Sequence, residues 1–352
     1  MIGRALILSP SGGLGGGIER YVETLEWAFT AQGIEYLRVD LHHGDRRRAS
    51  DHVGMLTQCR RHLRASGMPT RLVAAHRTLL PVASLLARER SACGISVLCH
   101  GTDVWGDRPA LRQSIESRLM RRPDVRVVAV SSYTAGALSG DCQVTILRPG
   151  LSREWFHTLV DSSGRAQKHG QGMSIVTAFR LGDWRGKGLP QLLKAVTDLD
   201  RADVRLTVCG SGEPPPELQL LIRRYPFCRL MSGLTDRELA SELAEADLFV
   251  LATRTRHGRH PSGEGFGLVL LEAQVAGTPV VAPACGGSHD AYIDQITGVA
   301  PTEETAESLS ETLGTLLKDP CQLAQMGRRA AEWAREAFSP EHYASRAVAR
   351  LL

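Results

Sequence analysis

Short apolar runs alternate with longer stretches of helical periodicity along almost the whole chain. In the first half, such runs predict strands at residues 5–8, 34–39, 72–75, 96–99, 125–130 and 143–147. Between the first two runs, residues 18–31 place Tyr21, Val22, Leu25 and Phe29 at the i, i+3, i+4 spacing of an amphipathic helix. Strands that alternate with helices predict a parallel α/β sheet.

The alternation is interrupted once and then begins again. Residues 160–173 are polar, contain glycines and have few apolar positions, which predicts a linker. Beyond it, strands are expected at 174–178, 205–209, 247–251 and 278–282, and helices at 188–199, 216–224, 268–275 and 306–317. The pattern therefore predicts two doubly wound, Rossmann-like domains, at residues 1–165 and 166–335.

Composition and charge agree with two folded domains. The length of 352 residues suits two domains of ordinary size, and 43% hydrophobic with 23% charged residues excludes a disordered chain. Residues 1–165 hold 22 Lys and Arg against 15 Asp and Glu, whereas residues 166–352 hold 20 against 23. The basic half could favour an acidic substrate or an anionic membrane surface, and an ordinary solvated surface is the alternative.

The cysteines and histidines give no sign of a metal site. The eight cysteines show neither CxxC nor metal-type spacing, so reduced thiols are expected, and His42, His43, His52, His62 and His76 are interpreted as surface or structural residues. We expect a cytoplasmic protein without a signal peptide or membrane span, at most peripheral to a membrane. A nucleic-acid partner is not expected.

A glycine-rich loop, residues 12–17, lies between the first strand and the first helix. Backbone N–H groups at such a helix N-terminus can bind a phosphate. The dinucleotide spacing GxGxxG is not met, although Asp40 at the end of the second strand keeps an NAD site as an alternative. A flexible turn is the other alternative.

Two further loops carry charges between a strand and a helix. Arg180 and Lys187 flank the first, and two cations in such a loop suit a diphosphate, although the loop is not a Walker sequence. In the second, Glu264 and Glu272 stand eight residues apart on either side of a loop-to-helix turn with Gly265 and Gly267. Glu272 falls in an apolar helix and needs a partner, either ligand hydroxyls or a buried arginine.

The Glu264 to Glu272 spacing resembles the EX7E motif of retaining GT-B glycosyltransferases, and EGFGLVLLEA is similar to family 4 of that class. Segments in the same order along the chain strengthen the resemblance: Gly16-Gly17-Ile18-Glu19, His100-Gly101-Thr102-Asp103, Arg180 with Lys187-Gly188, Cys209-Gly210-Ser211-Gly212-Glu213-Pro214, Ala276-Gly277-Thr278-Pro279 and Gly286-Gly287. The resemblance implies a GT-B fold, two Rossmann-like domains facing a central cleft. The N-terminal domain would bind the acceptor, and residues 336–352 would form a terminal helix that crosses back to it.

The resemblance also implies roles for particular residues. His100, Arg180, Lys187 and Glu264 would be catalytic, with His100 facing the donor sugar and Arg180 and Lys187 neutralising the diphosphate. Glu272 would accept hydrogen bonds from the ribose hydroxyls. The donor would be bound by Gly16, Gly17, Asp103, Arg180, Lys187, Gly210, Phe266, Gly267, Leu268, Val269 and Glu272. No metal and no other cofactor would be needed, because cations and amides stabilise the leaving diphosphate.

Several points stay open from the sequence. The donor would be a UDP- or GDP-sugar, and the acceptor a hydroxyl of a sugar, a lipid-linked sugar or a natural product. Phe179 replaces the family's glycine, and residues 254–263 are longer and more basic than usual. We interpret that segment as an exposed loop rather than one that orders on ligand binding. The alternatives to a glycosyltransferase are a non-catalytic nucleotide-sugar-binding protein and a nucleotide-sugar epimerase of the same fold.

Overall fold

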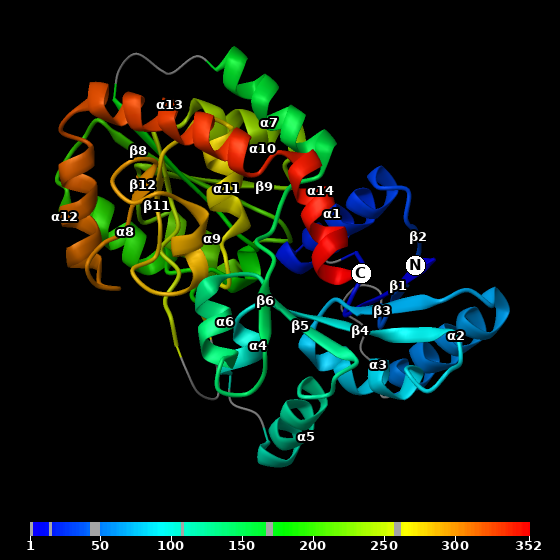
Figure 1. Ribbon diagram of the computed structural model, residues 1–352. Coiled ribbons are helices and arrows are strands. Elements are labelled where there is room, and N and C mark those ends of the chain that lie inside the picture. Colours follow the sequence, from blue (N-terminus) through cyan, green and yellow to red (C-terminus); the bar gives the residue numbers. More distant parts are fainter. Residues whose placement is uncertain (1–2, 14–15, 43–49, 107–108, 167–171, 257–261) are drawn as a thin grey trace. The chain divides into compact units, whose positions relative to one another are not determined.

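The computed structural model describes residues 3–13, 16–42, 50–106, 109–166, 172–256 and 262–352. The chain forms two compact units (Figure 1). Unit 1 contains the chain up to Ser152 together with Pro340–Leu352. Unit 2 contains Arg153–Arg256 and Ser262–Ser339.

Unit 1 is built on a parallel sheet with the strand order β2-β1-β3-β4-β5-β6 in the described part of the chain. Its strands are β1 (Arg4–Ser9), β2 (Glu35–Asp40), β3 (Thr70–Ala74), β4 (Ala92–Cys99), β5 (Val125–Ala129) and β6 (Val144–Ile146). Each strand overlaps a predicted apolar run. The order reverses between β1 and β3, which is the switch point of a doubly wound sheet.

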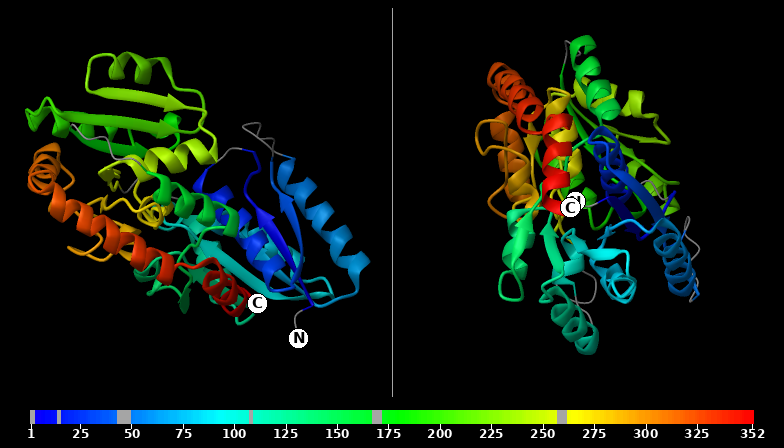
Figure 2. Two further views of the ribbon diagram at one scale, coloured as in Figure 1. Left: turned by 90° about the horizontal axis from the view of Figure 1, so that it is seen from above. Right: turned by 45° about the vertical axis from the view of Figure 1, so that its right-hand side comes forward.

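Successive strand residues point to opposite faces of this sheet, and helices cover both faces. Unit 1 has α1 (Gly17–Ala31), α2 (Asp51–Ser66), α3 (Leu80–Leu86), α4 (Thr102–Trp105), α5 (Ala110–Met120), α6 (Ser132–Leu138) and α14 (Pro340–Leu351). Apolar residues of α2, α3 and α5 form one core with alternate residues of the strands. The C-terminal helix α14 packs beside α1 (Figure 2), and the carbonyl oxygen of Leu351 accepts a hydrogen bond from Ser96 Oγ of β4 at 2.6 Å.

Unit 2 repeats the architecture with the strand order β12-β11-β10-β7-β8-β9, again parallel throughout the described strands. They are β7 (Met173–Ala178), β8 (Val204–Gly210), β9 (Cys228–Ser232), β10 (Leu248–Val250), β11 (Val280–Val281) and β12 (Gly298–Val299). The sequence pattern missed β9 and β12. Both lie at the edges of the sheet; β12 has two residues, and β9 is only partly buried, so neither produces a clear apolar run.

Six of the described helices of unit 2 pack in pairs. Unit 2 has α7 (Arg153–Arg165), α8 (Leu189–Asp198), α9 (Pro216–Ile222), α10 (Asp236–Glu245), α11 (Leu268–Val275), α12 (Ala306–Leu316) and α13 (Pro320–Ala337). The pairs are α7 with α10, α8 with α12, and α11 with α13. The apolar residues facing the sheet from α8, α12 and α13 form the main core.

The boundary between the units lies after Ser152 rather than after residue 165. Helix α7 buries Trp155, Phe156 and Leu159, and it packs on α10 and α11, so it belongs to unit 2. Residues 160–165 of the predicted linker are therefore the end of a helix, while 167–171 lie outside the described residues. Helix α7 buries only one stripe, which leaves its last turn as polar as a linker.

Candidate active site

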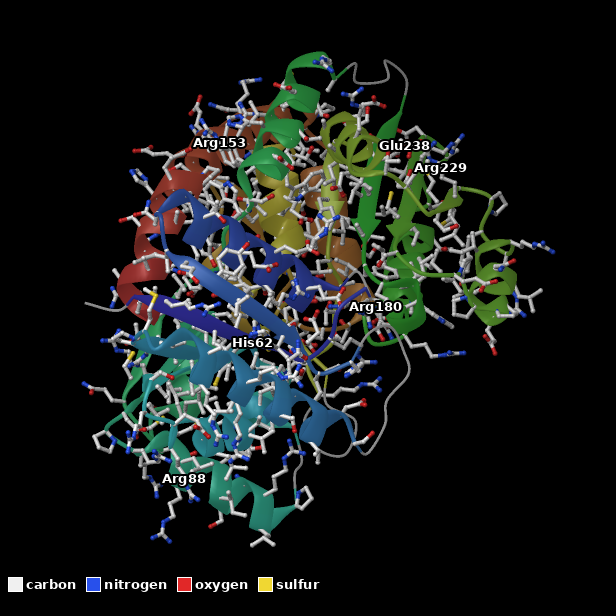
Figure 3. All side chains as sticks on the ribbon, turned by 90° about the vertical axis from the view of Figure 1, so that its right-hand side faces the viewer. His62, Arg88, Arg153, Arg180, Arg229 and Glu238 are labelled. Atoms are coloured by element: carbon white, nitrogen blue, oxygen red, sulfur yellow. The ribbon has the colours of Figure 1, made fainter. Side chains whose placement is uncertain are left out.

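The loop after β7 carries both predicted cations of unit 2. Arg180 (labelled in Figure 3) precedes a short 3₁₀ turn, Leu181–Asp183, and Lys187 ends the loop before α8. The loop leaves the carboxyl end of a central strand, which is where ligands bind in open α/β sheets. Arg185 lies over the buried Trp184 ring at 4.0 Å.

Lys187 and Glu264 form an ion pair across the ends of two strands. Lys187 Nζ donates to Glu264 Oε1 at 2.5 Å, and Thr253 Oγ1 donates to the same oxygen at 2.7 Å. Glu264 and Thr253 are buried, and Lys187 is half-buried. The family resemblance implied separate roles for these two charged residues, at the diphosphate and at the sugar. In the structure they are partners, and Thr253, which the sequence reasoning missed, fixes the carboxylate.

Glycine at two positions makes this arrangement sterically feasible. Gly188 has φ +70°, and a Cβ atom there would lie 1.8 Å from the carbonyl oxygen of Ala252. Gly286 has φ +109°, and a Cβ atom there would lie 3.0 Å from the carbonyl oxygen of Glu264. That same carbonyl accepts a hydrogen bond from the N–H of Gly287 at 2.7 Å. The chain therefore approaches the ion pair closely from both sides.

Helix α11 begins at the predicted turn. Gly267 adopts the left-handed conformation (φ +83°, ψ +62°) immediately before the first helical residue, Leu268. Leu270 N–H donates to Gly267 O at 2.9 Å, and helix geometry leaves the amides of Leu268 and Val269 without an intrahelical acceptor. Such amides form an anion-binding site at a helix N-terminus. Phe266 is buried against Phe338, so only its backbone is available to a ligand.

Glu272 is buried on α11, and a tryptophan donates a hydrogen bond to it. The indole nitrogen Nε1 of Trp155 donates to Glu272 Oε1 at 3.0 Å. The sequence suggested either ligand hydroxyls or a buried arginine as the partner of this carboxylate, and Trp155 on α7 was missed. No spacing rule could have paired two residues 117 positions apart.

Gly210 ends β8, and its surroundings explain the glycine without a ligand. A Cβ atom there would lie 2.3 Å from the carbonyl oxygen of Phe179 and 2.5 Å from a methyl group of Leu181. Close packing against the neighbouring strand therefore accounts for this position. The basic segment 254–263 is tied at its ends, because Arg256 and Ser262 exchange two backbone hydrogen bonds of 3.1 Å, while 257–261 lie outside the described residues.

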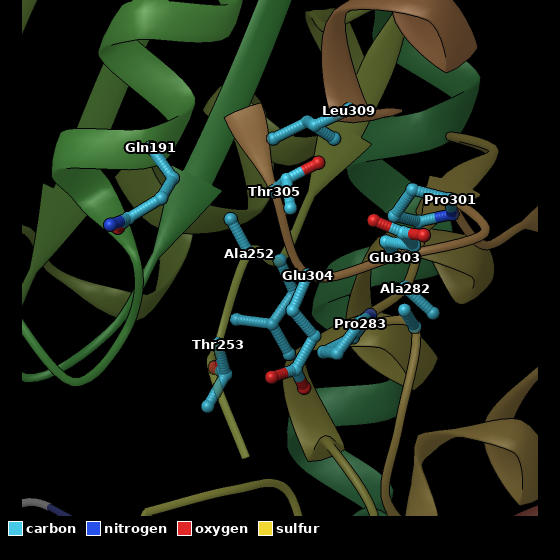
Figure 4. A pocket seen from close by; sticks show the side chains of 12 residues that line it. Gln191, Ala252, Thr253, Ala282, Pro283, Pro301, Glu303, Glu304, Thr305 and Leu309 are labelled. Carbon is cyan, nitrogen blue, oxygen red and sulfur yellow. The ribbon is translucent and has the colours of Figure 1, made fainter. Parts of the chain in front are cut away.

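A small cavity adjoins Thr253 in unit 2 (Figure 4). Gln191, Thr253, Glu304 and Thr305 line it together with apolar residues. Glu304 accepts the N–H of Thr255, at 2.8 and 2.9 Å to its two oxygens. The cavity has ≈ 20 Å³ of space, which holds a water molecule but not a nucleotide.

In unit 1, His100 stands at the carboxyl end of β4 with a fixed ring orientation. Its Nε2 contacts the carbonyl oxygen of Ala75 at 2.8 Å. Because a carbonyl only accepts, Nε2 carries the proton and Nδ1 is the acceptor of the neutral ring. Burial lowers the pKa of His100 below its ordinary value, although the charge of Asp103 acts in the opposite direction. The ring therefore favours the neutral form, which accepts a hydrogen bond from a hydroxyl.

Asp103 holds the loop that carries His100. Its Oδ1 accepts the N–H of His100 at 2.8 Å and that of Gly101 at 2.7 Å. These contacts give Asp103 a part in shaping the loop, and its predicted contact with the donor stays a prediction. His76 stacks on His100 with ring centroids 6.0 Å apart, and its Nε2 is 3.9 Å from Asp103 Oδ2. The sequence reasoning interpreted His76 as a surface or structural residue, although it follows a predicted strand just as His100 does.

The predicted glycine loop of unit 1 is described only in part. Gly16 precedes α1 in an extended conformation, and Gly17 begins the helix. A Cβ atom at Gly17 would meet no atom of the chain within 4 Å, so the fold alone does not require a glycine there. Asp40 is the residue that kept an NAD site as an alternative. Its Oδ1 accepts a hydrogen bond from Arg38 Nε at 2.7 Å.

Two features are absent from the described residues. Their His, Cys, Asp and Glu side chains form no group of three or more that could hold a metal ion. Among the same residues, no helix is both long and apolar enough to cross a membrane.

Comparison with known proteins identifies the family of this chain. Residues 173–333, which include most of unit 2, match the family described as Glycosyl transferases group 1. The chain is 31% identical over 262 residues to a GDP-mannose-dependent alpha-(1-6)-phosphatidylinositol monomannoside mannosyltransferase of Mycolicibacterium smegmatis, covering 71% of this chain and 67% of that protein. The chain belongs to the group 1 glycosyltransferases. It is an enzyme that transfers a hexose, which confirms the predicted class over an epimerase or a binding protein.

Solved structures confirm the predicted GT-B fold of this glycosyltransferase. A sucrose-phosphate synthase from Thermosynechococcus elongatus matches with a TM-score of 0.76 and 18% identity, over 97% of both chains. HepE of Anabaena, solved in complex with UDP-glucose, matches with a TM-score of 0.74 and 16% identity, over 99% of both chains. At such low identity these likenesses support the fold alone.

Proposed function

We propose that this glycosyltransferase moves a hexose from a nucleotide diphospho-sugar to an acceptor hydroxyl with retention of configuration. The observation that carries the proposal is the arrangement at the start of α11. There a left-handed glycine exposes helix amides between two buried carboxylates, and the Lys187 cation is held by Glu264. Amides and cations of this kind stabilise charge that develops on a leaving diphosphate.

Each residue has a part in the proposal. Arg180, Lys187 and the amides of Leu268 and Val269 bind the diphosphate. Glu272 accepts hydrogen bonds from the ribose hydroxyls. Lys187 already shares Glu264 Oε1 with Thr253, so we infer that the other oxygen of Glu264 meets the hydroxyls of the donor sugar. Neutral His100 accepts a hydrogen bond from a hydroxyl of that sugar through Nδ1. The reaction proceeds without a metal ion, and the leaving phosphate accepts the proton of the acceptor.

The donor is a GDP- or UDP-sugar. The mycobacterial relative named above uses GDP-mannose, and HepE was solved with UDP-glucose, so both bases occur among proteins that resemble this chain. For the acceptor we propose an anionic, lipid-linked glycoside. The excess of arginine in residues 1–165 suits such an acceptor at an anionic membrane surface, to which the enzyme binds peripherally.

The donor proposal is tested by thermal shift with UDP-, GDP-, ADP- and dTDP-sugars, followed by turnover of the sugar that binds. We expect Glu272→Gln to weaken donor binding and Arg180→Ala to lower turnover. Glu238→Gln and Arg229→Ala, also labelled in Figure 3, are matched controls on the surface of unit 2. Gln also suits the helix-capping position of Glu238. If both site variants behave like their controls, the site assignment is wrong.

Stereochemistry and metal use need separate measurements. NMR of the first product formed should show the anomeric configuration of the donor, and an inverted centre would contradict the proposed mechanism. Turnover should persist after treatment with EDTA; its loss, restored by a divalent cation, would contradict metal independence. Sedimentation with anionic and with zwitterionic vesicles tests the membrane proposal, which predicts binding to the anionic vesicles that weakens as salt rises.

A further inference from the structure

Trp155 contacts the site of unit 2 from a helix rather than from a loop at the end of a strand. It lies on α7, its side chain is buried, and its indole N–H points at Glu272 Oε1 on α11. Nothing in the family motifs discussed above involves this residue. Its hydrogen bond is nevertheless made to the carboxylate proposed to bind the ribose.

The physical setting makes this contact more than ordinary packing. Glu272 is 4% exposed, and a buried carboxylate depends on hydrogen-bond donors to remain charged. An indole ring has a single donor and adds no charge, so it binds one oxygen without neutralising the group. An arginine at the same place could bind both oxygens in parallel and occupy the carboxylate.

The position of the indole is also set rigidly. Helix α7 packs along α10 and against α11, and it buries Phe156 and Leu159 next to Trp155. A tryptophan side chain has only two rotatable bonds, so packing of the ring fixes the direction of its N–H. The carboxylate plane of Glu272 is therefore set by a helix that is 117 residues away in the sequence.

We propose that Trp155 is a positioning residue for donor binding. By holding Oε1, the indole N–H fixes the orientation in which the Glu272 carboxylate meets the two ribose hydroxyls. The inference rests on the proposed role of Glu272. It adds a determinant of selectivity for ribose-containing nucleotides, located on the helix that begins unit 2.

The test compares ligands with and without the hydroxyls. Binding of GDP and UDP is measured by calorimetry beside that of their 2′,3′-dideoxy counterparts, and the pair that binds the wild type is used. Trp155→Phe retains a ring but removes the donor. We expect about tenfold weaker binding of the ribonucleotide, the scale of one hydrogen bond to a charged group, and little change for the dideoxy nucleotide.

A second substitution and a control separate positioning from packing. Replacing Trp155 by benzothienylalanine keeps the size of the ring and removes only the N–H. This replacement should also weaken binding of the ribonucleotide alone, and it tests the proposal even if Trp155→Phe disturbs the fold. Trp333→Phe, on α13 against Phe338, should leave both affinities unchanged. Equal weakening of both nucleotides by the Trp155 substitutions, or no weakening, would overturn the proposal.

Glu272→Gln separates the proposed ribose contact of Glu272 from the proposed positioning role of Trp155. If this variant also loses affinity only for the ribonucleotide, the role of Glu272 stands and the Trp155 result decides the inference. If Glu272→Gln binds ribonucleotide and dideoxynucleotide with unchanged affinities, the proposed ribose contact fails, and the inference about Trp155 fails with it.

Discussion

Gly188 offers the most direct test of how the fold places Lys187 beside Glu264. In Gly188→Ala, the new Cβ atom would lie 1.8 Å from Ala252 O, whereas real Cβ atoms essentially never come closer than 3.0 Å. The loop must therefore retreat by at least the difference, 1.2 Å. The left-handed backbone adds about 1–2 kcal/mol of strain, and overpacking adds about 1–3 kcal/mol, so we expect a loss of about 2–5 kcal/mol.

Two glycines nearby separate the causes of that loss. Gly212 also has a positive φ, +86°, but a Cβ atom there meets nothing within 4 Å, so Gly212→Ala should cost only the backbone strain of about 1–2 kcal/mol. Gly182 has open space and no left-handed backbone, so Gly182→Ala should be neutral or stabilising by about 0.4–1 kcal/mol. The three variants thus form a graded series within unit 2.

The assay follows urea unfolding by tryptophan fluorescence, together with turnover of the identified donor. We expect midpoints in the order Gly182→Ala, Gly212→Ala, Gly188→Ala, with the last lowest. Because a displacement of about 1 Å at a reacting group costs about 100-fold in rate, folded Gly188→Ala should also lose turnover on that scale. A Gly188→Ala midpoint equal to that of Gly212→Ala would refute the steric argument, and unchanged turnover would refute the placement of Lys187 at the reaction.

Three other predictions follow from single contacts. The Arg77–Glu116 pair of unit 1 is buried at 3.0 Å, so Arg77→Met should lower the free energy of unfolding by about 3 kcal/mol, whereas Arg121→Ala, which breaks an exposed pair with Asp141, should cost less than about 1 kcal/mol by the same urea titration. Since the pKa of His100 is lowered in the folded state, the unfolded chain takes up its proton first; wild type should lose stability as pH falls through 6.5, and His100→Gln should lose less between pH 7 and 5. Gly17→Ala should keep the wild-type unfolding midpoint, because its Cβ atom meets nothing, yet weaken nucleotide binding measured by calorimetry if a ligand needs that space; unchanged binding would remove Gly17 from the site.

Much of the fold follows from local pattern. The buried central strands β1, β3, β4, β7 and β8 are rich in apolar residues, because both faces of a parallel sheet are covered. The edge strands β9 and β12 and the polar last turn of α7 escaped detection for the opposite reason. They bury too little apolar surface to leave a periodic signal, and the boundary between the units was misplaced with them.

The sequence by itself determined the residue types of the site: two cations in a glycine loop, two carboxylates eight residues apart and a histidine after a strand. These motifs are local, and their loops are built from neighbouring residues with the backbone freedom that glycine provides. Only the tertiary structure decided the partners. It paired Lys187 with Glu264 through Thr253, turned Asp103 toward its own loop, stacked His76 on His100 and brought Trp155 to Glu272. Apart from the local contacts of Asp103, these contacts join residues 11 to 117 positions apart. The packing of whole helices and strands sets them, and no spacing along the chain records it.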